Sequence, residues 1–341
     1  MNTPLIKNVF RVCMILFHTF LTNVHGQSNT NRLIESKLDA YYEVLEKNWN
    51  VNGYWGKAAQ QKDNRYNEAI LFYQYKELKN PSDTSIFPKI KKAIYYSFNF
   101  LQHEDGGMLQ ENIPVHVRTS LFLEAIAKVA VHHPEILKDS LIREGIMCAV
   151  NWLKEPHEFA FNHNIAAMLA FNSLSKLYDD KIFKQLELDY RKLLLENFIA
   201  IDKYHGYWPE APETWSNRLN KPYLLVQSMF LNAYIMQEND SEIQKLYQKL
   251  NRYILSQINL EKGTISIENS LGHFDANQKE VPVSCVSFFQ AYPARINMLE
   301  KKNKKLLHKL ITHFDAGSKK APVLLYTDLY YRFTLGISSN K

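Results

Sequence analysis

One short stretch of the chain, EFAFNHNIAAMLAF at 158–171, places an amide and an imidazole directly before an apolar helical run. Asn162 can cap this helix, and His163 then lies in its first turn. Both side chains can donate hydrogen bonds to negative charge that develops on a substrate. The alternative, a simple N-cap followed by a satisfied interior histidine, stays open.

A second stretch, NRLNKPYLLVQSMF at 217–230, has a tyrosine at the start of an apolar helix. Pro222 suits the first turn of a helix, so Tyr223 lies close to the positive end of the helix dipole. Arg218 is five residues upstream and could fold back over the phenol. Both features favour tyrosinate and lower a pKa that is ordinarily about 10. The alternative is an amphipathic side chain at a core boundary beside a surface arginine.

Together these groups fit β-elimination at a uronate sugar. This reaction removes the proton next to a carboxylate and expels the 4-linked sugar oxygen. Amide, imidazole or guanidinium donors must take up the charge that builds on the carboxylate. A base must meet the proton and an acid must protonate the leaving oxygen, and one tyrosine can do both.

The spacing resembles that of the polysaccharide lyases with an (α/α) toroid, above all the single-domain alginate lyases. In those families an Asn-His pair, a Gly-containing loop with acidic and arginine residues, and a Tyr follow in this order. The matching residues are Asn162–His163, the loop 206–218 and Tyr223, while Phe161 and Leu224 differ from the family pattern. The resemblance implies that Asn162 and His163 neutralise the carboxylate, that Tyr223 is base and acid, and that Arg218 supports both.

Other polar and aromatic residues are candidates for substrate binding. His116 and Arg118, in the loop EDGGMLQENIPVHVR, could bind sugar carboxylates or simply form a polar helix entry. His273, in the last long loop, could add a third donor or be a solvated histidine. Glu213 belongs to the loop that matches the lyases. Four aromatic residues could line a sugar groove, or their side chains could only fill space at the rim. They are Tyr54, Trp55, Trp208 and Trp215.

Helical periodicity dominates the chain, which predicts an all-α fold. The expected helices lie near 32–49, 65–79, 87–103, 117–132, 138–154, 163–178, 181–200, 222–237, 240–256, 282–299, 302–315 and 322–336. Only GTISIE at 263–268 alternates like a strand. Helices such as 166–174 and 224–233 are apolar nearly all round and are therefore covered on both sides.

Long loops that contain glycine and aromatic residues precede several of these helices. They span 52–65, 104–118, 205–218 and 262–282, whereas the connections between them are mostly short and polar. Alternating long and short connections predict helical hairpins whose long loops share one rim. We therefore expect an incomplete toroid of the (α/α)6 type, with an irregular helical domain as the alternative.

The N-terminus has the parts of a secretory signal. Lys7 and Arg11 precede an apolar stretch from about Val12, and cleavage is expected before Gln27. The apolar run is short for a bilayer span of about 20 residues. We therefore expect a signal peptide at 1–26, one domain at 27–341, no membrane span after cleavage, and a periplasmic or secreted protein.

Composition excludes some classes. The formal net charge of +6 is too weak and too scattered for a nucleic-acid footprint. No Cys-His spacing resembles a zinc site, so we expect no metal and no cofactor. Cys148 and Cys285 could form a disulfide or stay as two thiols, and the sequence leaves the oligomeric state open.

Three functions remain. The first is a secreted lyase for a 1,4-linked uronate polysaccharide such as alginate or glucuronan, with an acidic polysaccharide as partner. The second is a glycoside hydrolase on the same toroid that uses a pair of acidic side chains; the candidates are Asp105, Glu111, Glu210 and Glu213. The third is a non-catalytic glycan-binding protein.

Overall fold

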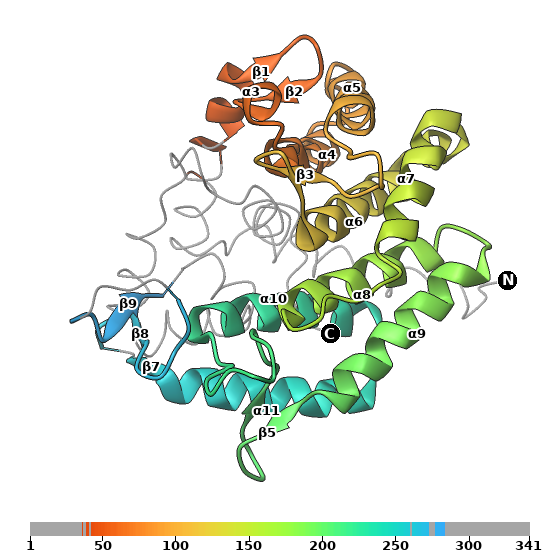
Figure 1. Ribbon diagram of the computed structural model, residues 1–341. Helices are drawn as coiled ribbons and strands as arrows, with labels where there is room; N and C mark the ends of the chain where they lie inside the picture. Colours follow the sequence, from red (N-terminus) through yellow and green to blue (C-terminus); the bar gives the residue numbers. More distant parts are fainter. Residues whose placement is uncertain (1–35, 37–38, 41, 260, 273–276, 284–341) are drawn as a thin grey trace, which may run out of the picture.

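The computed structural model describes residues 36, 39–40, 42–259, 261–272 and 277–283, and most of them are helical (Figure 1). The helices follow one another as hairpins around an arc, which confirms the predicted all-α fold of the (α/α)-toroid type. Several predictions lie outside the described residues: the signal peptide at 1–26, His273, Cys285, the helices 302–315 and 322–336, and nearly all of 282–299.

Eight long helices form the described part of the arc. They are α4 (Ile70–Lys79), α5 (Ile86–Phe100), α6 (His116–His132), α7 (Ser140–Trp152), α8 (Phe161–Ser175), α9 (Lys181–Glu196), α10 (Lys221–Gln237) and α11 (Ser241–Gln257). Shorter helical turns are α3 (Ala58–Gln61), η1 (Asn64–Ala69), which leads into α4, and η2 (Pro134–Lys138).

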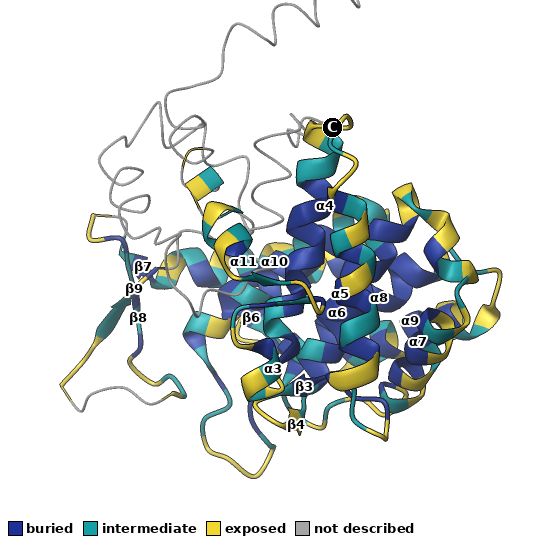
Figure 2. Ribbon diagram, turned by 90° about the horizontal axis from the view of Figure 1, so that it is seen from above, coloured by how far each residue is buried: buried dark blue, intermediate teal, exposed yellow. Residues whose placement is uncertain are grey.

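The helices alternate between an inner and an outer ring. Helix α4 packs on α6, α6 on α8 and α8 on α10, whereas α5, α9 and α11 lie behind α4, α8 and α10 (Figure 1). The inner helix α8 is buried from Phe161 to Leu174 at every position except His163, as expected for a helix that is apolar nearly all round. The outer helix α11 buries only Ile243, Leu250 and Ile254 and exposes much of its surface (Figure 2).

Short antiparallel strand pairs stiffen the long loops before the inner helices. They are β1–β2 (Trp49–Asn50, Tyr54–Trp55), β3–β4 (Leu109–Gln110, Ile113–Pro114) and β5–β6 (Ile199–Ala200, Gly206–Tyr207). A three-stranded sheet follows α11 and consists of β7 (Ile258–Asn259), β8 (Thr264–Ser266) and β9 (Glu280–Pro282). The predicted strand 263–268 contains β8. The long loops thus collect at the N-terminal ends of the inner helices, as the alternating loop lengths predict.

Two glycines let the long loops approach the outer helices. Gly53 and Gly106 both have φ near +106°, a conformation that favours glycine. A Cβ at Gly53 would lie 2.5 Å from the Lys92 carbonyl oxygen on α5, and one at Gly106 would lie 2.2 Å from the Cys148 carbonyl oxygen on α7. Each loop is therefore fixed to the outer ring before it leads into an inner helix.

The helices differ in how they begin, and the inner helix α10 resembles the outer ones in having a side-chain cap, Asn220. The outer helices α7, α9 and α11 start with Asp139, Asp180 and Asp240, whose carboxylates accept backbone N–H groups of the first turn. The inner helices α6 and α8 have Val115 and Ala160 at this position and no side-chain cap. Their N-terminal N–H groups must find partners elsewhere or face a ligand, which makes this rim the candidate site.

Candidate active site

The loop between β6 and α10 supplies the missing partners at the start of α8. The N–H of Phe161 donates to the Pro209 carbonyl oxygen at 3.2 Å, and the N–H of Asn162 donates to Oε1 of Glu210 at 3.1 Å. The same loop is closed by the N–H of Glu210, which donates to the Arg218 carbonyl oxygen at 2.8 Å. Glu210 thus lies at a helix N-terminus although it is 48 residues away in sequence.

Glu210 is a carboxyl group with an unusual pKa. Its Oε1 also accepts a hydrogen bond from Nε2 of Gln227 on α10, and that amide donates to the Trp208 carbonyl oxygen at 3.0 Å. Burial raises the pKa of Glu210 to about 8, although both hydrogen bonds favour the charged form. The group is therefore mostly protonated near neutral pH. Since Oε1 accepts both bonds, the other oxygen is the one that can carry the proton.

Three histidines form a cluster beside this helix start. The His163 ring lies 5.9 Å from that of His116, in a stacked arrangement, and 4.7 Å from that of His157. The rings of His116 and His157 are 5.9 Å apart. The described residues nevertheless include no group of three or more His, Cys, Asp and Glu side chains placed to hold a metal ion.

In the rings of His116 and His157, hydrogen bonds determine which of the two nitrogens carries the proton. The Tyr190 hydroxyl donates to the Leu153 carbonyl oxygen at 2.7 Å, so Nε2 of His116, 3.1 Å from that hydroxyl, is the donor. The N–H of Ala160 donates to Nδ1 of His157 at 3.2 Å, which leaves the proton of that ring on Nε2. Nδ1 of His116 therefore has a free lone pair.

The whole histidine cluster is neutral. Burial, together with a smaller effect of the neighbouring histidines, lowers the pKa of His116 to about 3 and that of His163 to about 2. Burial also lowers the pKa of His157. None of the three rings is an imidazolium cation at neutral pH, because removal from water disfavours the charged form.

An ion pair borders the cluster on the side of α6 and η1. Nη1 of Arg118 lies 2.8 and 3.0 Å from the two carboxylate oxygens of Glu68, which is fully buried. The charge of Arg118 is felt at His163, whose pKa it lowers. Arg118 and His116 were predicted from the sequence as candidate site residues, whereas Glu68 and His157 were not. The one available signal for Glu68 is an acidic residue at the start of the buried run 68–75.

Several buried polar atoms in this region have no hydrogen-bond partner among the described residues. They are Nδ1 of His116, Nδ1 of His163, Nε of Arg118, Oδ1 of Asn162 and Oε1 of Gln227. Buried polar groups are usually paired, so such a concentration marks a place where a ligand can complete the network. Donors and acceptors of this mixed kind suit the hydroxyl groups of a sugar.

The start of α10 is different. Tyr223 is 47% exposed, its N–H donates to Oδ1 of Asn220 at 3.4 Å, and its hydroxyl makes no hydrogen bond to a described residue. Nε of Arg218 donates to the Ala211 carbonyl oxygen at 3.0 Å, and its Nη1 lies 3.8 Å from Glu213. The charge of Arg218 acts on Tyr207. The structure thus places Arg218 within its own loop rather than over Tyr223.

The predicted aromatic groove is only partly exposed. Trp55 and Trp208 are buried in the core, where their indole N–H groups donate to the Tyr73 hydroxyl at 3.1 Å and the Leu194 carbonyl oxygen at 2.7 Å. Neither ring presents a face to a ligand. Tyr54 is half-buried beside Tyr96, and Trp215 is 56% exposed. Only these last two can contact a glycan in this structure.

The other carboxylates proposed for a hydrolase are at the surface. Asp105 accepts the N–H of Gly107 at 3.0 Å and lies 2.9 Å from Nδ1 of His103. Glu111 pairs with Arg65 at 2.7 Å and is 64% exposed, and Glu213 is 84% exposed. Of the four candidates, Glu210 alone is enclosed.

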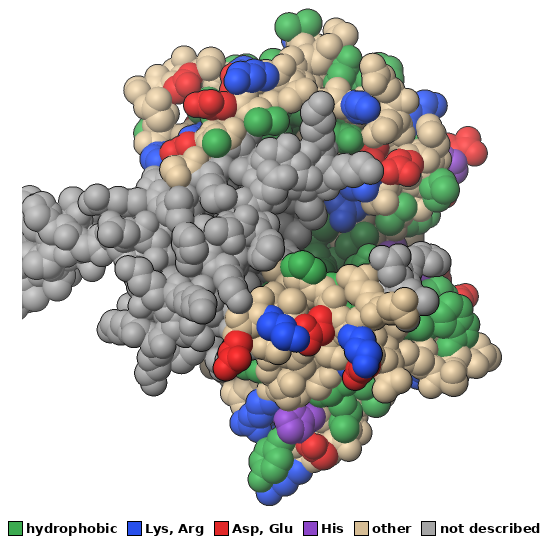
Figure 3. Space-filling model, turned by 90° about the vertical axis from the view of Figure 1, so that its left-hand side faces the viewer, with side chains coloured by type: hydrophobic (Ala, Val, Ile, Leu, Met, Phe, Trp, Pro, Cys, Tyr) green, Lys and Arg blue, Asp and Glu red, His purple; other side chains and the backbone are tan. Residues whose placement is uncertain are grey.

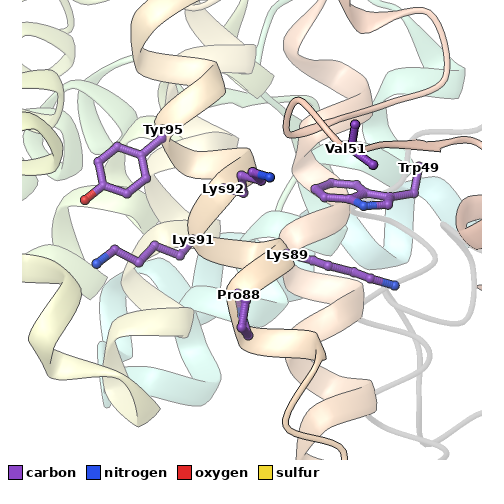
Figure 4. Close-up of a pocket in the computed structure, with 7 residues that line it drawn as sticks. All are labelled: Trp49, Val51, Pro88, Lys89, Lys91, Lys92 and Tyr95. Atoms are coloured by element: carbon purple, nitrogen blue, oxygen red, sulfur yellow. The ribbon is translucent and has the colours of Figure 1, made fainter.

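Two further features bear on the location of the site. The concave side of the arc shows a hollow with hydrophobic walls between the parts that carry β1–β2 and β7–β9 (Figure 3). A separate shallow hollow of about 420 Å³ lies on α5, lined by Trp49, Val51, Pro88, Lys89, Lys91, Lys92 and Tyr95, and it includes none of the clustered residues (Figure 4). No helix among the described residues is long and apolar enough to span a bilayer.

Comparison with known proteins identifies the fold. No protein-family model matches the chain, and the search of curated proteins finds no match either. Solved structures match over most of their length. A sugar epimerase from a ruminal bacterium is 12% identical, with a TM-score of 0.63 over 90% of this chain and 99% of that one.

Two hydrolases match as well. Unsaturated glucuronyl hydrolase from Streptococcus agalactiae is 12% identical, with a TM-score of 0.55 over 91% of this chain and 92% of that one. A family 76 α-mannanase from Bacteroides thetaiotaomicron is 10% identical, with a TM-score of 0.51 over 89% and 94%. At these identities the likeness shows the fold, an (α/α) toroid of the kind found in carbohydrate-active enzymes.

The prediction of a polysaccharide lyase is wrong on this comparison, because the matching structures are glycan hydrolases and sugar epimerases. The geometry agrees with this correction. Neutral His163 carries no charge to offset a carboxylate. The resemblance in spacing reflected the shared toroid, in which loops and inner helices recur at similar intervals.

Proposed function

We propose that the protein is a glycoside hydrolase in which Glu210 is the general acid. The observation that carries this proposal is a carboxyl group enclosed at the N-terminus of α8, with its pKa raised by burial to about 8. Cleavage of a glycosidic bond needs an acid that is still protonated at working pH and that gives its proton to the leaving oxygen. Glu210 meets this requirement.

The neighbouring groups have a binding role in this proposal. Nδ1 of His116 can accept a hydrogen bond from a sugar hydroxyl, and Oδ1 of Asn162 can accept another. His163 lies between them, in the first turn of α8. These contacts would hold the sugar at the helix start while Glu210 protonates the leaving group. Two enzymes of the same fold, the unsaturated glucuronyl hydrolase and the α-mannanase, support this class of reaction.

The test is a screen of purified protein against neutral and acidic glycans, with chromatography of the products. We expect saturated sugars with a new reducing end. Glu210→Gln should lower kcat about 10²- to 10⁴-fold, because the amide cannot donate the proton of an acid. Glu213→Gln is the matched control on the same loop and should stay within about twofold of wild type, because its side chain is 84% exposed. Equal activity of wild type and Glu210→Gln would overturn the proposal.

A sugar epimerase is the second candidate. The epimerase with the same fold supports it. The products separate the two candidates. An epimerase exchanges one sugar for its stereoisomer without shortening the chain, and it incorporates deuterium from D₂O at the reacting carbon.

We also propose that the mature protein is exported and that 27–341 forms one domain. Basic Lys7 and Arg11 followed by an apolar stretch support export. The test is N-terminal sequencing of the protein recovered from the periplasm or the medium, with Gln27 expected as the first residue. A cytosolic product that retains Met1 would refute export without affecting the proposed reaction.

A further inference from the structure

The arginines on the rim of the long loops are each held by a carboxylate. Arg65 lies at the start of η1 and pairs with Asp63 and with Glu111, the latter at 2.7 Å. Arg118 pairs with Glu68 at 2.8 Å, and Arg218 lies 3.8 Å from Glu213. In the described part of this rim, no arginine is left to bind an anion by itself.

The Arg118–Glu68 pair is the one that matters at the candidate site. Glu68 is fully buried and Arg118 is 13% exposed, so water screens their interaction little. The Glu68 carboxylate takes up one guanidinium nitrogen with both of its oxygens, while Nε of Arg118 remains without a partner. Above the pKa of about 7 to which burial raises Glu68, the pair therefore has almost no net charge but still offers a hydrogen-bond donor.

The remaining groups around this pair are also uncharged. His116 is buried and His163 partly buried, and their rings lie 5.9 Å apart, with His163 within reach of the charge of Arg118. Asn162 and Gln227 contribute amide oxygens without partners. A uronate carboxylate that entered here would lose its hydration and find Arg118 already paired with Glu68, which is costly. A hydroxyl group would find both donors and acceptors.

We propose that the Glu68–Arg118 pair makes this site selective for uncharged sugars, because Glu68 cancels the charge with which Arg118 would otherwise attract a carboxylate. This inference rests on the proposed function in that the ligand is a glycan. It replaces the expectation of an acidic polysaccharide with that of a neutral one.

The experiment compares matched pairs of oligosaccharides that differ only in the oxidation state of C6: glucose and glucuronate, mannose and mannuronate, galactose and galacturonate chains of equal length. Binding is measured by calorimetry at pH 8, above the value of about 7 to which burial raises the pKa of Glu68. The wild type should bind a neutral member and not its uronate partner. Its affinity should stay constant from about 20 to about 500 mM NaCl.

Variants of the pair reverse the preference if the inference is correct. Glu68→Gln frees the charge of Arg118 and should raise uronate affinity at least about tenfold. The double change Glu68→Gln with Arg118→Gln restores neutrality and should abolish that gain. Glu111→Gln, which removes an exposed partner of Arg65, is the control and should leave the preference unchanged.

Each outcome either supports or overturns the proposed selectivity for uncharged sugars. A wild type that prefers uronate chains, with an affinity that falls as salt rises, overturns the inference and leaves a hydrolase possible. A folded Glu68→Gln protein without any gain for uronates also overturns it. Should Glu68→Gln fail to fold, the wild-type preference and its salt dependence still decide. Binding of neutral sugars without any product would support the inference and refute the proposed function.

Discussion

The starts of α8 and α10 are two inner helix ends with similar sequences and different environments. Each follows a loop and leads into an apolar helix, and each carries a residue suited to proton transfer or charge stabilisation. At α8, Asn162 is 4% exposed and its N–H donates to the enclosed carboxyl group of Glu210. At α10, Tyr223 is 47% exposed, and Asn220 caps its N–H.

The difference shows what a helix N-terminus needs to become a chemical site. Helix α10 has its own side-chain cap, Asn220, and the N–H of its first residue, Lys221, donates to Oγ of Ser270 at 2.9 Å. Helix α8 has no side-chain cap, and the loop 205–218 folds back to provide Pro209 and Glu210. This contact removes Glu210 from water and shifts its pKa. A side-chain cap and a distant hydroxyl group thus complete the start of α10, whereas a distant carboxyl group completes the start of α8.

The largest test of this comparison exchanges one residue at each helix start. His163→Ala removes a buried ring beside Asn162 and should lower kcat/KM about 10²-fold, since the ring and its unpartnered Nδ1 would no longer contact the sugar. Tyr223→Phe should change kcat/KM less than about threefold, because the hydroxyl of Tyr223 contacts no described residue. Steady-state kinetics on the best glycan from the screen provide the measurement.

Both variants should unfold near the wild-type midpoint, which circular dichroism can check. A loss of activity in Tyr223→Phe greater than that in His163→Ala would reverse the comparison. It would move the site from the start of α8 to the start of α10.

The second test concerns the link between the two helices. With Glu210 as acid, activity should fall about tenfold per pH unit above pH 8, because its pKa is raised to about 8. Gln227 on α10 donates to Glu210 and so lowers this pKa. Gln227→Met removes the donor, and the alkaline limb of kcat/KM should move to higher pH. Rate profiles of wild type and variant between pH 5 and pH 10 show the shift.

Stability against pH gives an independent check. A carboxyl group whose pKa is raised by folding contributes stability that is fully present below its unfolded pKa and is lost as pH rises through the folded pKa. Wild type should therefore lose stability relative to Glu210→Gln between about pH 4.5 and about pH 8. Glu68, whose pKa burial also raises, is present in both proteins and cancels in the difference. A constant difference across this range would mean that Glu210 is not enclosed.

Much of the fold could be predicted because its signals are local. The apolar run 166–174 has no polar face, which indicates an inner helix, and α8 is indeed covered on both sides. The alternation of long and short loops likewise predicted one rim for the strand pairs. Helix α8 begins at Phe161 with Ala160 at the N-cap position, so the prediction that Asn162 caps this helix is wrong, although the predicted start at residue 163 is close to the observed one.

The chemistry of the site could not be predicted in the same way. The sequence offered four acidic residues for a hydrolase, and only the contact between Glu210 and Asn162 distinguishes one of them. That contact joins residues 48 positions apart, so no local pattern contains it. Tyr223 was chosen for its place near a helix dipole; its side chain is 47% exposed. Trp55 and Trp208 looked suited to a groove, yet large apolar rings gain more by burial in the core.

The smallest expected effect follows from removal of the side-chain cap of α10. Asn220→Ala leaves the N–H of Tyr223 without its acceptor and should lower the free energy of unfolding by about 1 kcal/mol. Asp180→Ala at the start of the outer helix α9 is the matched control, and urea denaturation should give a similar loss. Neither change should alter kcat/KM by more than about twofold. If Asn220→Ala instead reduced activity while Asp180→Ala did not, the end of α10 would take part in the reaction.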